Sequence, residues 1–443
     1  MFSNKQLRKL IVPLVIEQFL VISLGMIDTV MVSAVGEAAV SGVSIVDMLN
    51  VLVIDIFAGL ATGGAVVVSH YLGAKNKGDA SKTGSQLISI CALFGAAVFV
   101  LVILFRTQIM NLLFGSVEKD VMDSAMIYLT ITAVSFPFIS VYNGSAALFR
   151  TMGNSRISMT SSLVINIVNI AGNALFIFVF HMGVTGAALS TLIARFIAMW
   201  YLLFRLERPE QDIVVSIEEM KPKLLTVKKI LKIGIPASAE SSMFQLGRVI
   251  VVTLIATFGT AQIAANAMAN NLDAFGCIAG KGFQLAVITV IGQCIGAERN
   301  NEAVRYSKKL MKWVYIVATV SNGIVLTTLP LTSRLYNISD EARSLGIILV
   351  LIHAGCALFL WPSAFVPPQC LKAGGDANFT MIVSVASMWV FRILLSYLIG
   401  MHFGLGAIGV WIAMVVDWIF RATMFITRFH SRKWLHKSLA AID

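Results

Sequence analysis

Long apolar segments separated by short polar ones dominate the pattern of this chain. Each apolar segment is about 20 residues long, which is the length at which an α-helix crosses the hydrocarbon core of a bilayer. Short glycine-containing turns such as "HMGVTG" and "HFGLGAIG" divide some of them. The pattern predicts twelve transmembrane helices, at 11–33, 44–69, 84–105, 124–148, 157–180, 184–204, 233–257, 264–292, 313–331, 345–370, 379–400 and 407–427.

The composition agrees with this pattern. Of the 443 residues, 58% are hydrophobic and only 13% are charged, which excludes an ordinary soluble domain. The first apolar run follows basic residues, as in a signal peptide, but it is long and has no small-residue cleavage site before its end. We therefore keep it as the first helix of an all-α integral membrane protein.

The basic residues predict the orientation of the chain. With the amino terminus in the cytoplasm, most of the 34 Lys and Arg residues fall on the inner side. The four that fall outside are Arg106, Lys119, Arg334 and Arg343. We expect a multi-pass protein of the cytoplasmic (inner) membrane with both termini cytoplasmic. The net charge of +11 then reflects contact with anionic membrane lipid, and no basic stripe with interleaved aromatics points to nucleic acid.

The cysteines suggest neither redox nor metal chemistry. All five lie in or at the ends of spans and none forms a CxxC pair, so we expect no disulfide framework, no metal held by cysteine and no cofactor. They are Cys91, Cys277, Cys294, Cys356 and Cys370.

The sequence repeats itself at an offset of 223 positions. "LRKLIVPLVIEQ" at 7–18 aligns with "ILKIGIPASAES" at 230–241, so that Pro13 meets Pro236 and Glu17 meets Glu240. "LGAKNKGDA" at 72–80 likewise meets "IGAERNNEA" at 295–303. Each half therefore holds six helices. Because six is even, the halves share one orientation, and we expect a pseudo-two-fold axis along the membrane normal.

The repeat predicts two lobes and the place of their connection. We expect an N-terminal six-helix lobe over 1–204, a polar cytoplasmic linker over 205–229 and a C-terminal six-helix lobe over 230–443. Two such lobes with a cleft between them are typical of transporters, in which rocking of the lobes exposes the cleft to each side in turn. We expect the chain to act as a monomer.

A carboxylate interrupts the first apolar run. Asp28 in "SLGMIDTVMV" costs about 2.5 to 3.5 kcal/mol at the centre of a span, so it must face protein or water. Asn169 and Asn173 share a face of the fifth span, and Thr191 lies in the sixth. Counted at about 1.5 Å per residue, Asp28, Asn173 and Thr191 lie at similar depths, roughly 8 to 10 Å below the outer surface. The group predicts a site for Na⁺ or a proton.

One observation supports this hypothesis, and one alternative would explain the residues without a cation. At the aligned positions of the second half the residues are Val251, Arg392, Ser396 and Met414, which could not hold a cation. Alternatively, Asp28 pairs with Arg195 inside the lobe, and the asparagines only tie helices together by hydrogen bonds.

Other intramembrane charges form a second group, which we place in the substrate cleft. Its polar members are Glu17, Asp55, Glu240 and Lys281, and Met26 and Phe244 represent a deformable apolar wall. Three ion pairs are plausible by depth, namely Glu240 with Arg248, Asp55 with Lys281, and Arg392 with Asp417. For this group a structural role is as well supported as a functional one.

The motifs together resemble one family. "GMIDTVMV", "GLATGGAVVVSHYLGAKNKGDA", "MGNSRIS", "GVTGAALSTLIARF" and "IGQCIGAERNNEA" resemble the multidrug and toxic compound extrusion (MATE) family over essentially the whole chain. The resemblance implies a V-shaped pair of six-helix lobes that exports organic, often cationic compounds in exchange for Na⁺ or H⁺. The family's coupling-cation motif maps onto Asp28, Asn169, Asn173 and Thr191. Some members also use an acidic residue in helix 10, but "LWPSAFVPPQCLK" has none, which leaves Glu240 as the acidic candidate of the second lobe.

These observations predict a secondary exporter of small organic cations or drugs, coupled to influx of Na⁺ or H⁺ by alternating access. A lipid-linked precursor flippase of the same superfamily is the alternative, although it would more naturally have a strongly cationic cleft. No HExxH, GxSxG or nucleotide-binding motif is present, so we do not expect an enzyme.

Overall fold

The computed structural model describes residues 1–115 and 117–436. Within these residues it contains helices and their connections and no β-strand. Ten helices in this part are long and apolar enough to cross a membrane, and two bent helix pairs bring the number to twelve. The predicted all-α membrane fold with twelve spans is confirmed.

The chain divides into two compact units. One comprises Ser3–Ser238, and the other begins at Ala239 and includes Met1–Phe2. We call them the first and second lobe. The boundary falls inside the helix α8 (Leu224–Ala256), which therefore continues from one lobe into the next.

The segment predicted as a linker lies along the first lobe. The backbone N–H groups of Val214, Ser216 and Lys223 donate to the side chains of Ser81, Ser85 and Gln86 at 3.2, 3.1 and 2.9 Å. These three acceptors belong to one helix, so the linker is held against it and is not a free tether.

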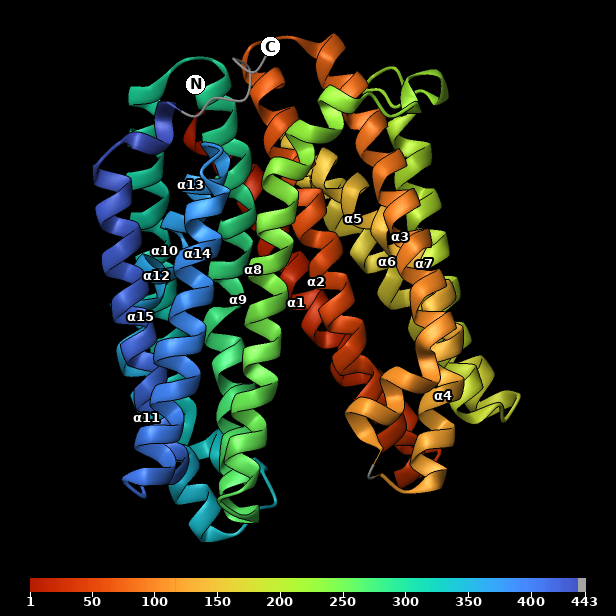
Figure 1. Cartoon of the computed structure of the whole chain (residues 1–443), viewed down its shortest axis with the longest axis vertical. Helices are drawn as coiled ribbons and strands as arrows, with labels where there is room; N and C mark the ends of the chain where they lie inside the picture. The colour runs from red at the N-terminus through yellow and green to blue at the C-terminus, as the bar shows by residue number, and fades with distance from the viewer. Residues whose placement is uncertain (116, 437–443) are drawn as a thin grey trace. The chain divides into compact units, whose positions relative to one another are not determined.

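The helices of the first lobe run beside one another (Figure 1). The spans α1 and α6 pack together, as do α6 and α7, and α2 packs against α4 and α5. A π-helical segment, η1 (Ala174–Val179), extends α6. The helices are α1 (Asn4–Ser33), α2 (Glu37–Gly73), α3 (Lys77–Phe114), α4 (Lys119–Val134), α5 (Phe136–Thr151), α6 (Ser155–Asn173) and α7 (Gly183–Leu206).

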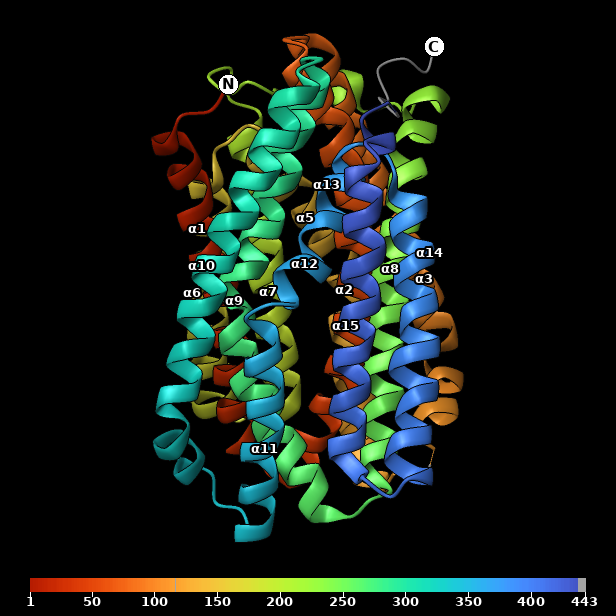
Figure 2. The same cartoon turned by 90° about the vertical axis from the view of Figure 1, so that its left-hand side faces the viewer.

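The second lobe is built in the same order. In Figure 2 its helix α11 is followed along the chain by the short helices α12 and α13, and α15 runs alongside α14. After the second part of α8 come α9 (Thr260–Gly296), α10 (Asn300–Thr332), α11 (Asp340–Ala357), α12 (Trp361–Phe365), α13 (Pro367–Ala373), α14 (Ala377–Ser387), the π-helical η4 (Met388–Leu394) and η5 (Tyr397–His402), and α15 (Gly406–His430).

The internal repeat predicted from the sequence recurs in the helix boundaries. The helices α2 and α9 have the same length of 37 residues and begin and end 223 positions apart. The same offset relates the starts of α3 and α10, of α7 and α15, and of η1 and η5. The segment η4 has no such counterpart, because the aligned part of α6 keeps regular α-helical geometry.

Proline residues break one predicted span in each lobe. The pair α4 and α5 bends by 50°, and Pro137 stands at the start of α5. The pair made of α11 and the α12–α13 segment bends by 69°, with prolines at the starts of both short helices. Proline has no N–H to donate and its ring clashes with the preceding turn, so a helix bends or ends there.

Glycines let helices approach closely in both lobes. A Cβ on Gly42 of α2 would lie 2.9 Å from the backbone nitrogen of Ala125 on α4. The aligned residue of α9 is Ala265, and here the glycine belongs to the facing helix, because Gly346 of α11 lies opposite Ala265. Both lobes thus have the close helix contact, but the glycine lies on α2 in the first lobe and on the facing helix, α11, in the second.

Candidate cation site

Hydrogen bonds join the four residues predicted to hold the coupling ion. The Asn173 amide N–H donates to the Asp28 carboxylate and also to Asn169 Oδ1, at 3.1 Å in the latter case. The Asn169 amide donates in turn to Thr191 Oγ1 at 3.2 Å. The structure therefore brings together side chains from α1, α6 and α7 in one continuous chain of polar contacts.

The backbone of α6 and α7 determines this geometry. Asn169 and Asn173 are four residues apart, so they lie one above the other on the same helix face. At Gly172 a Cβ would meet Ser190 Oγ at 2.1 Å, and Ser190 donates to the Asn169 carbonyl at 3.0 Å. Any larger residue at Gly172 would separate the two helices and with them Asn169 from Thr191.

Three of the four residues of the site are buried, and Asp28 is half-buried. Asn169, Asn173 and Thr191 are 2%, 0% and 8% exposed. A buried hydrophobic cluster contributed by α1, α2, α4, η1 and α7 packs in the same lobe, including Val32, Val46, Leu129, Ile177 and Ala188. Water is thereby kept from most of the group, which strengthens the electrostatic interactions within it.

One polar atom of the group has no partner. Asn173 Oδ1 is fully buried and accepts no hydrogen bond within the described residues. A buried acceptor in this state costs about 1 to 3 kcal/mol, and native proteins rarely leave one without a reason. Carboxylate, amide and hydroxyl oxygens are ligands that a hard cation prefers, and the same oxygens can accommodate a proton shared with Asp28.

Arg195 does not neutralise Asp28 by direct pairing. Among the described residues no ion pair joins these two side chains. The Arg195 guanidinium instead donates to Ser135 Oγ at 2.7 Å, where it lies near enough to act on Asp28 through space. The alternative that Asp28 is bound to a guanidinium is therefore wrong for this structure. Asn166 is not part of the group either, because its amide donates to the Ser162 carbonyl at 2.8 Å.

Two neighbours of the site were missed by reasoning from sequence. Asp47 on α2 acts electrostatically on Asp28, and its carboxylate accepts a hydrogen bond from Asn50 at 3.3 Å. Tyr128 on α4 is 2% exposed and lies beside both Asp47 and Thr191. Asp47 was visible as an intramembrane acid, but nothing in the sequence placed α2 and α4 against α7, the helix that carries Thr191.

The two glutamates that align with each other in the repeat both form ion pairs inside their own lobes. Glu17 is 4% exposed, pairs with Arg150 at 3.0 Å and accepts a hydrogen bond from Ser158 at 2.7 Å. In the second lobe, Glu240 pairs with Lys372 at 3.0 Å and accepts from Ser384 at 3.0 Å.

These pairs revise two of the expected partnerships. Glu240 pairs with Lys372 and not with Arg248. Asp417 pairs with Arg421 at 3.1 Å and not with Arg392. Of the expected apolar cleft residues, Met26 is 55% exposed, and the Phe244 ring lies 5.6 Å from the Arg421 guanidinium. Asp55 and Lys281 belong to different lobes.

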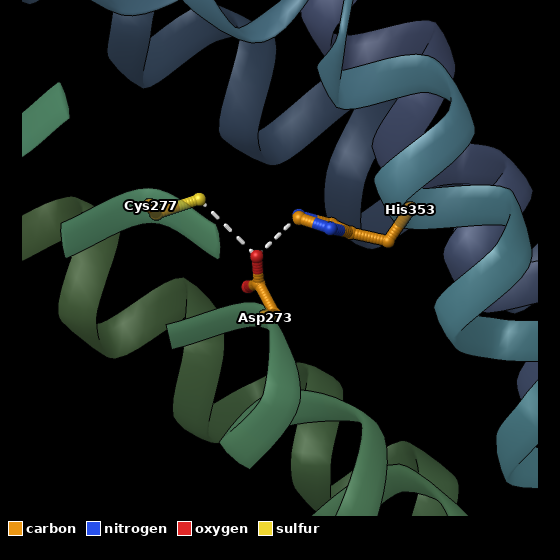
Figure 3. A group of neighbouring side chains, drawn as sticks. All are labelled: Asp273, Cys277 and His353. Carbon is orange, nitrogen blue, oxygen red and sulfur yellow. Dashed lines mark hydrogen bonds and ion pairs between the residues drawn. The ribbon is translucent and has the colours of Figure 1, made fainter. Parts of the chain in front are cut away.

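A second polar cluster occurs in the second lobe. Asp273 and Cys277 project from α9 towards His353 of α11 (Figure 3). His353 Nε2 lies 2.5 Å from Asp273 Oδ1, and the Cys277 thiol donates to the same oxygen at 3.2 Å. The three ligand atoms lie within 4.8 Å of one another, although the spacing of the cysteines predicted no metal ligand among them.

The chemistry of this cluster is that of a zinc site, but its spacing is that of an ion pair. Nitrogen, oxygen and sulfur are ligands of Zn²⁺, and two ligands of one tetrahedral ion stay about 3.3 Å apart. The carboxylate and imidazole are closer than this and contact each other directly. Asp273 is therefore engaged by His353. The five cysteines, Cys277 included, are free.

Comparison with known proteins agrees with this architecture. The MatE family model matches the chain twice, over residues 13–175 and 236–398, which are the two copies of the repeat. The uncharacterized transporter YisQ of Bacillus subtilis is 27% identical over 450 residues, covering 97% of this chain and 94% of the relative. The probable multidrug resistance protein NorM of Thermotoga maritima is 24% identical, covering 97% and 93%.

Solved structures share the fold. A MOP superfamily transporter from Pyrococcus furiosus superposes with a TM-score of 0.89 at 18% sequence identity, covering 97% of this chain and 96% of that one. An outward-facing multidrug resistance MATE family transporter gives a TM-score of 0.88, also at 18% identity, covering 97% and 96%. With both repeats matched by one family model, this twelve-span chain belongs to the MatE family of multidrug and toxic compound transporters.

Proposed function

We propose that the chain exports small organic cations in exchange for Na⁺ or H⁺, and that Asp28, Asn169, Asn173 and Thr191 hold the coupling ion. The observation that carries this proposal is the hydrogen-bonded chain from Asp28 through the two asparagines to Thr191. It joins a carboxylate, two amides and a hydroxyl, whose oxygens are ligands that a small hard cation prefers, in one hydrogen-bonded group.

Binding of the ion would rearrange this chain of contacts. The Asn173 amide nitrogen now faces the Asp28 carboxylate, while its oxygen is buried without a partner. Half a turn of the amide about its terminal bond exchanges the two atoms. Asn173 Oδ1 then faces Asp28, where it can coordinate Na⁺ or accept a hydrogen bond from the protonated carboxyl group.

Coupling requires that ion and drug favour different states of the transporter. An ion that bound both states equally would shift no equilibrium, however tightly it bound. Alternating access therefore follows from the proposal only if the occupied cluster stabilises the state that releases drug outwards. Asp28 lies on α1 and its partners on α6 and α7, so occupancy changes how these three helices are held together.

We also propose which residues contact the substrate. Asp55, Lys281, Met26 and Phe244 remain candidates for the cleft. The ion pairs of Glu17 and Glu240 favour a structural role for these two, although either could still contribute to the field that attracts an organic cation. We propose that the protein is a monomer in the cytoplasmic membrane, that both termini are cytoplasmic, and that no cofactor takes part.

The proposal can be tested with the purified full-length chain in proteoliposomes. Efflux of a panel of organic cations is measured with Na⁺ and pH gradients imposed separately, for the wild type and for Asp28→Asn. We expect one gradient to drive efflux and the variant to lose that response. The matched control is Asp123→Asn, which removes an exposed carboxylate of the same lobe and should behave as the wild type.

Two outcomes would refute the coupling role. Gradient-driven efflux by Asp28→Asn at the wild-type rate would remove Asp28 from the mechanism. Efflux that responds to neither gradient would remove the antiporter itself. The flippase alternative is not favoured, because the family match and the relatives point to multidrug transporters.

A further inference from the structure

A small cavity in the second lobe is lined by two arginines. Its volume is about 30 Å³, and α8, α9, η4 and α15 form its walls. A cavity needs about 10 to 15 Å³ on this measure to hold one water molecule, so this one can hold a small ion. The lining residues are Arg248, Val251, Val252, Asn266, Asn270, Arg392, Val410, Trp411 and Met414.

This cavity occupies the position that corresponds to the cation site of the first lobe. At the offset of 223, Asp28 aligns with Val251, Asn169 with Arg392, and Thr191 with Met414. All three aligned residues line the cavity. The repeat therefore has polar groups at matched backbone positions of both lobes, as a hydrogen-bonded cluster in the first and as a cavity in the second.

The charge of the pocket is reversed between the two copies. In the first lobe it includes Asp28 and Asp47, and the aligned residues of the second lobe are Val251 and the neutral Asn270. The two cavity arginines align instead with Gly25 and Asn169, which are uncharged. The first copy thus carries two carboxylates with one guanidinium group, that of Arg195, near them, and the second carries two guanidinium groups in the cavity.

No carboxylate neutralises these arginines directly. Within the described part of the chain, neither Arg248 nor Arg392 forms an ion pair, and Arg392 Nε is buried without a hydrogen-bond partner. The acids that act on Arg392 from a distance are Asp417 and Asp273. Asp417 Oδ1 is bound by Arg421 and Ser387, and its Oδ2 is buried without a hydrogen-bond partner in the described residues.

Asp273 also has other partners than the arginines. Its carboxylate faces His353 and Cys277 and contacts both (Figure 3). A partly buried arginine in a membrane-spanning segment is costly without a counter-charge, and two of them near each other repel. Around the pocket, the three arginines Arg248, Arg392 and Arg421 are thus accompanied by only two carboxylates, Asp273 and Asp417, which leaves an excess of positive charge.

The walls supply a neutral donor and bring the charges together. The Trp411 indole N–H donates to Asn266 Oδ1 at 3.0 Å, which fixes the amide and leaves its NH₂ group for the cavity. Met388 at the start of η4 packs so tightly on α8 that a Cβ at Gly247 would lie 2.4 Å from its sulfur. Arg248 follows that glycine, and Arg392 lies on η4, the π-helical segment without a counterpart in the first lobe.

We infer that this cavity is a binding site for a small monovalent anion, with chloride as its occupant. The two guanidinium groups would supply the charge and the Asn266 amide a further N–H donor. Arg248 is exposed, so the ion can reach the cavity from outside the lobe. In this arrangement the second lobe holds an anion at the position where the first lobe presents a carboxylate, and the bound ion stabilises the contact of α8 with η4.

The test follows the thermal stability of the purified full-length chain while chloride replaces gluconate at constant Na⁺ and constant ionic strength. Without gradients, the measurement does not depend on the proposed cation coupling. We expect the Tm of the wild type to rise and saturate with chloride. In Arg392→Gln the half-saturating chloride concentration should rise by about tenfold or more, because a charged partner is lost. The control Arg305→Gln, an exposed arginine of the same lobe, should respond as the wild type.

A second variant keeps the proposal testable if Arg392→Gln is unstable. Val251→Asp introduces the carboxylate that the first lobe has at this position, so it supplies the counter-charge internally. We expect this variant to have a higher Tm than the wild type in gluconate and to lose the response to chloride. Crystals of the wild type soaked in bromide should show an anomalous peak between Arg248 and Arg392.

Three results would overturn the proposal. They are a chloride response that is equal in the wild type and Arg392→Gln, a wild-type response in Val251→Asp, and the absence of bromide from the cavity.

Discussion

The two lobes have the same order of spans and share several helix boundaries, but they have opposite chemistry at one matched position. In the first lobe Asp28 and the asparagines of α6 form a buried acidic cluster. In the second lobe the aligned position is a small cavity with two arginines. The ion pairs of Glu17 and Glu240, in contrast, occur in both.

This difference separates what the fold needs from what the function needs. A residue pair that recurs in both copies of a repeat holds the same two helices together twice, so its role is structural. A cluster present in one copy is not required for folding of the repeat, since the other copy folds without it. By this criterion we expect a structural role for Glu17 and propose a functional one for Asp28.

We expect the largest effect on stability from breaking the glutamate ion pair that occurs in both lobes. Glu17→Gln removes the carboxylate that pairs with the partly buried Arg150, and Glu240→Gln removes the one that pairs with Lys372. Each should lower the free energy of unfolding by about 3 to 5 kcal/mol, which is the usual cost of breaking a buried pair. Thermal unfolding in detergent measures this.

Replacement of both partners is the control. The variant Glu17→Gln with Arg150→Met removes the stranded charge, so it should be more stable than Glu17→Gln alone. A destabilisation confined to one lobe would contradict the structural reading of these pairs.

The second prediction places a residue of the second lobe into the first. Asn169→Arg introduces the arginine found at the aligned position 392, and its permanent positive charge would occupy the place of the coupling ion beside Asp28. Gradient-driven efflux should fall by about 100-fold, which is at the upper end of typical coupling energies. Transport assays in proteoliposomes measure it, and Asn166→Gln, at a residue outside the group, is the control. Wild-type coupling in Asn169→Arg would show that the cluster does not bind the ion.

The smallest effect concerns the glycines that change sides. Gly42→Ala forces its new methyl group against the α4 backbone, so we expect a loss of about 1 to 3 kcal/mol of stability. At Gly346 the nearest atom is the flexible end of Met268, at 2.3 Å from the added Cβ, and it can move away. Gly346→Ala should therefore cost less than about 1 kcal/mol. If thermal unfolding showed equal losses of stability for Gly42→Ala and Gly346→Ala, the explanation from the atoms that face each glycine would be wrong.

The length of apolar runs predicted the spans and the repeat correctly, since both depend on local composition. The cluster around Asp28 could also be found, because depth along a helix is counted from its ends at a fixed rise per residue. It is harder to predict which neighbouring helix a given helix face contacts. Asp47 and Tyr128 were missed because the rotation of α2 and α4 about their axes depends on packing, and the bend at Pro137 changes that packing.

The ion-pair partners show the same difficulty. The expected pairing of Arg392 with Asp417 was reasonable by depth, but the acid has a closer partner four residues away on its own helix, Arg421. The π-helical geometry of η4 further shifts the direction in which Arg392 points, and no simple pattern in the sequence announces it. His353 was not considered as a partner of Asp273 because the two are far apart in the chain.

The connection between the lobes has a consequence for how the chain could move. The residues before α8 are attached to α3, so the main covalent connection between the lobes is α8 itself, a helix without interruption from Leu224 to Ala256. Pro236 lies within it, three residues before the second lobe begins. A proline removes one rung of the helix ladder, so bending is easiest there. The helix α8 is therefore a stiff connection that bends most easily at Pro236, and this limits the directions in which one lobe can move relative to the other.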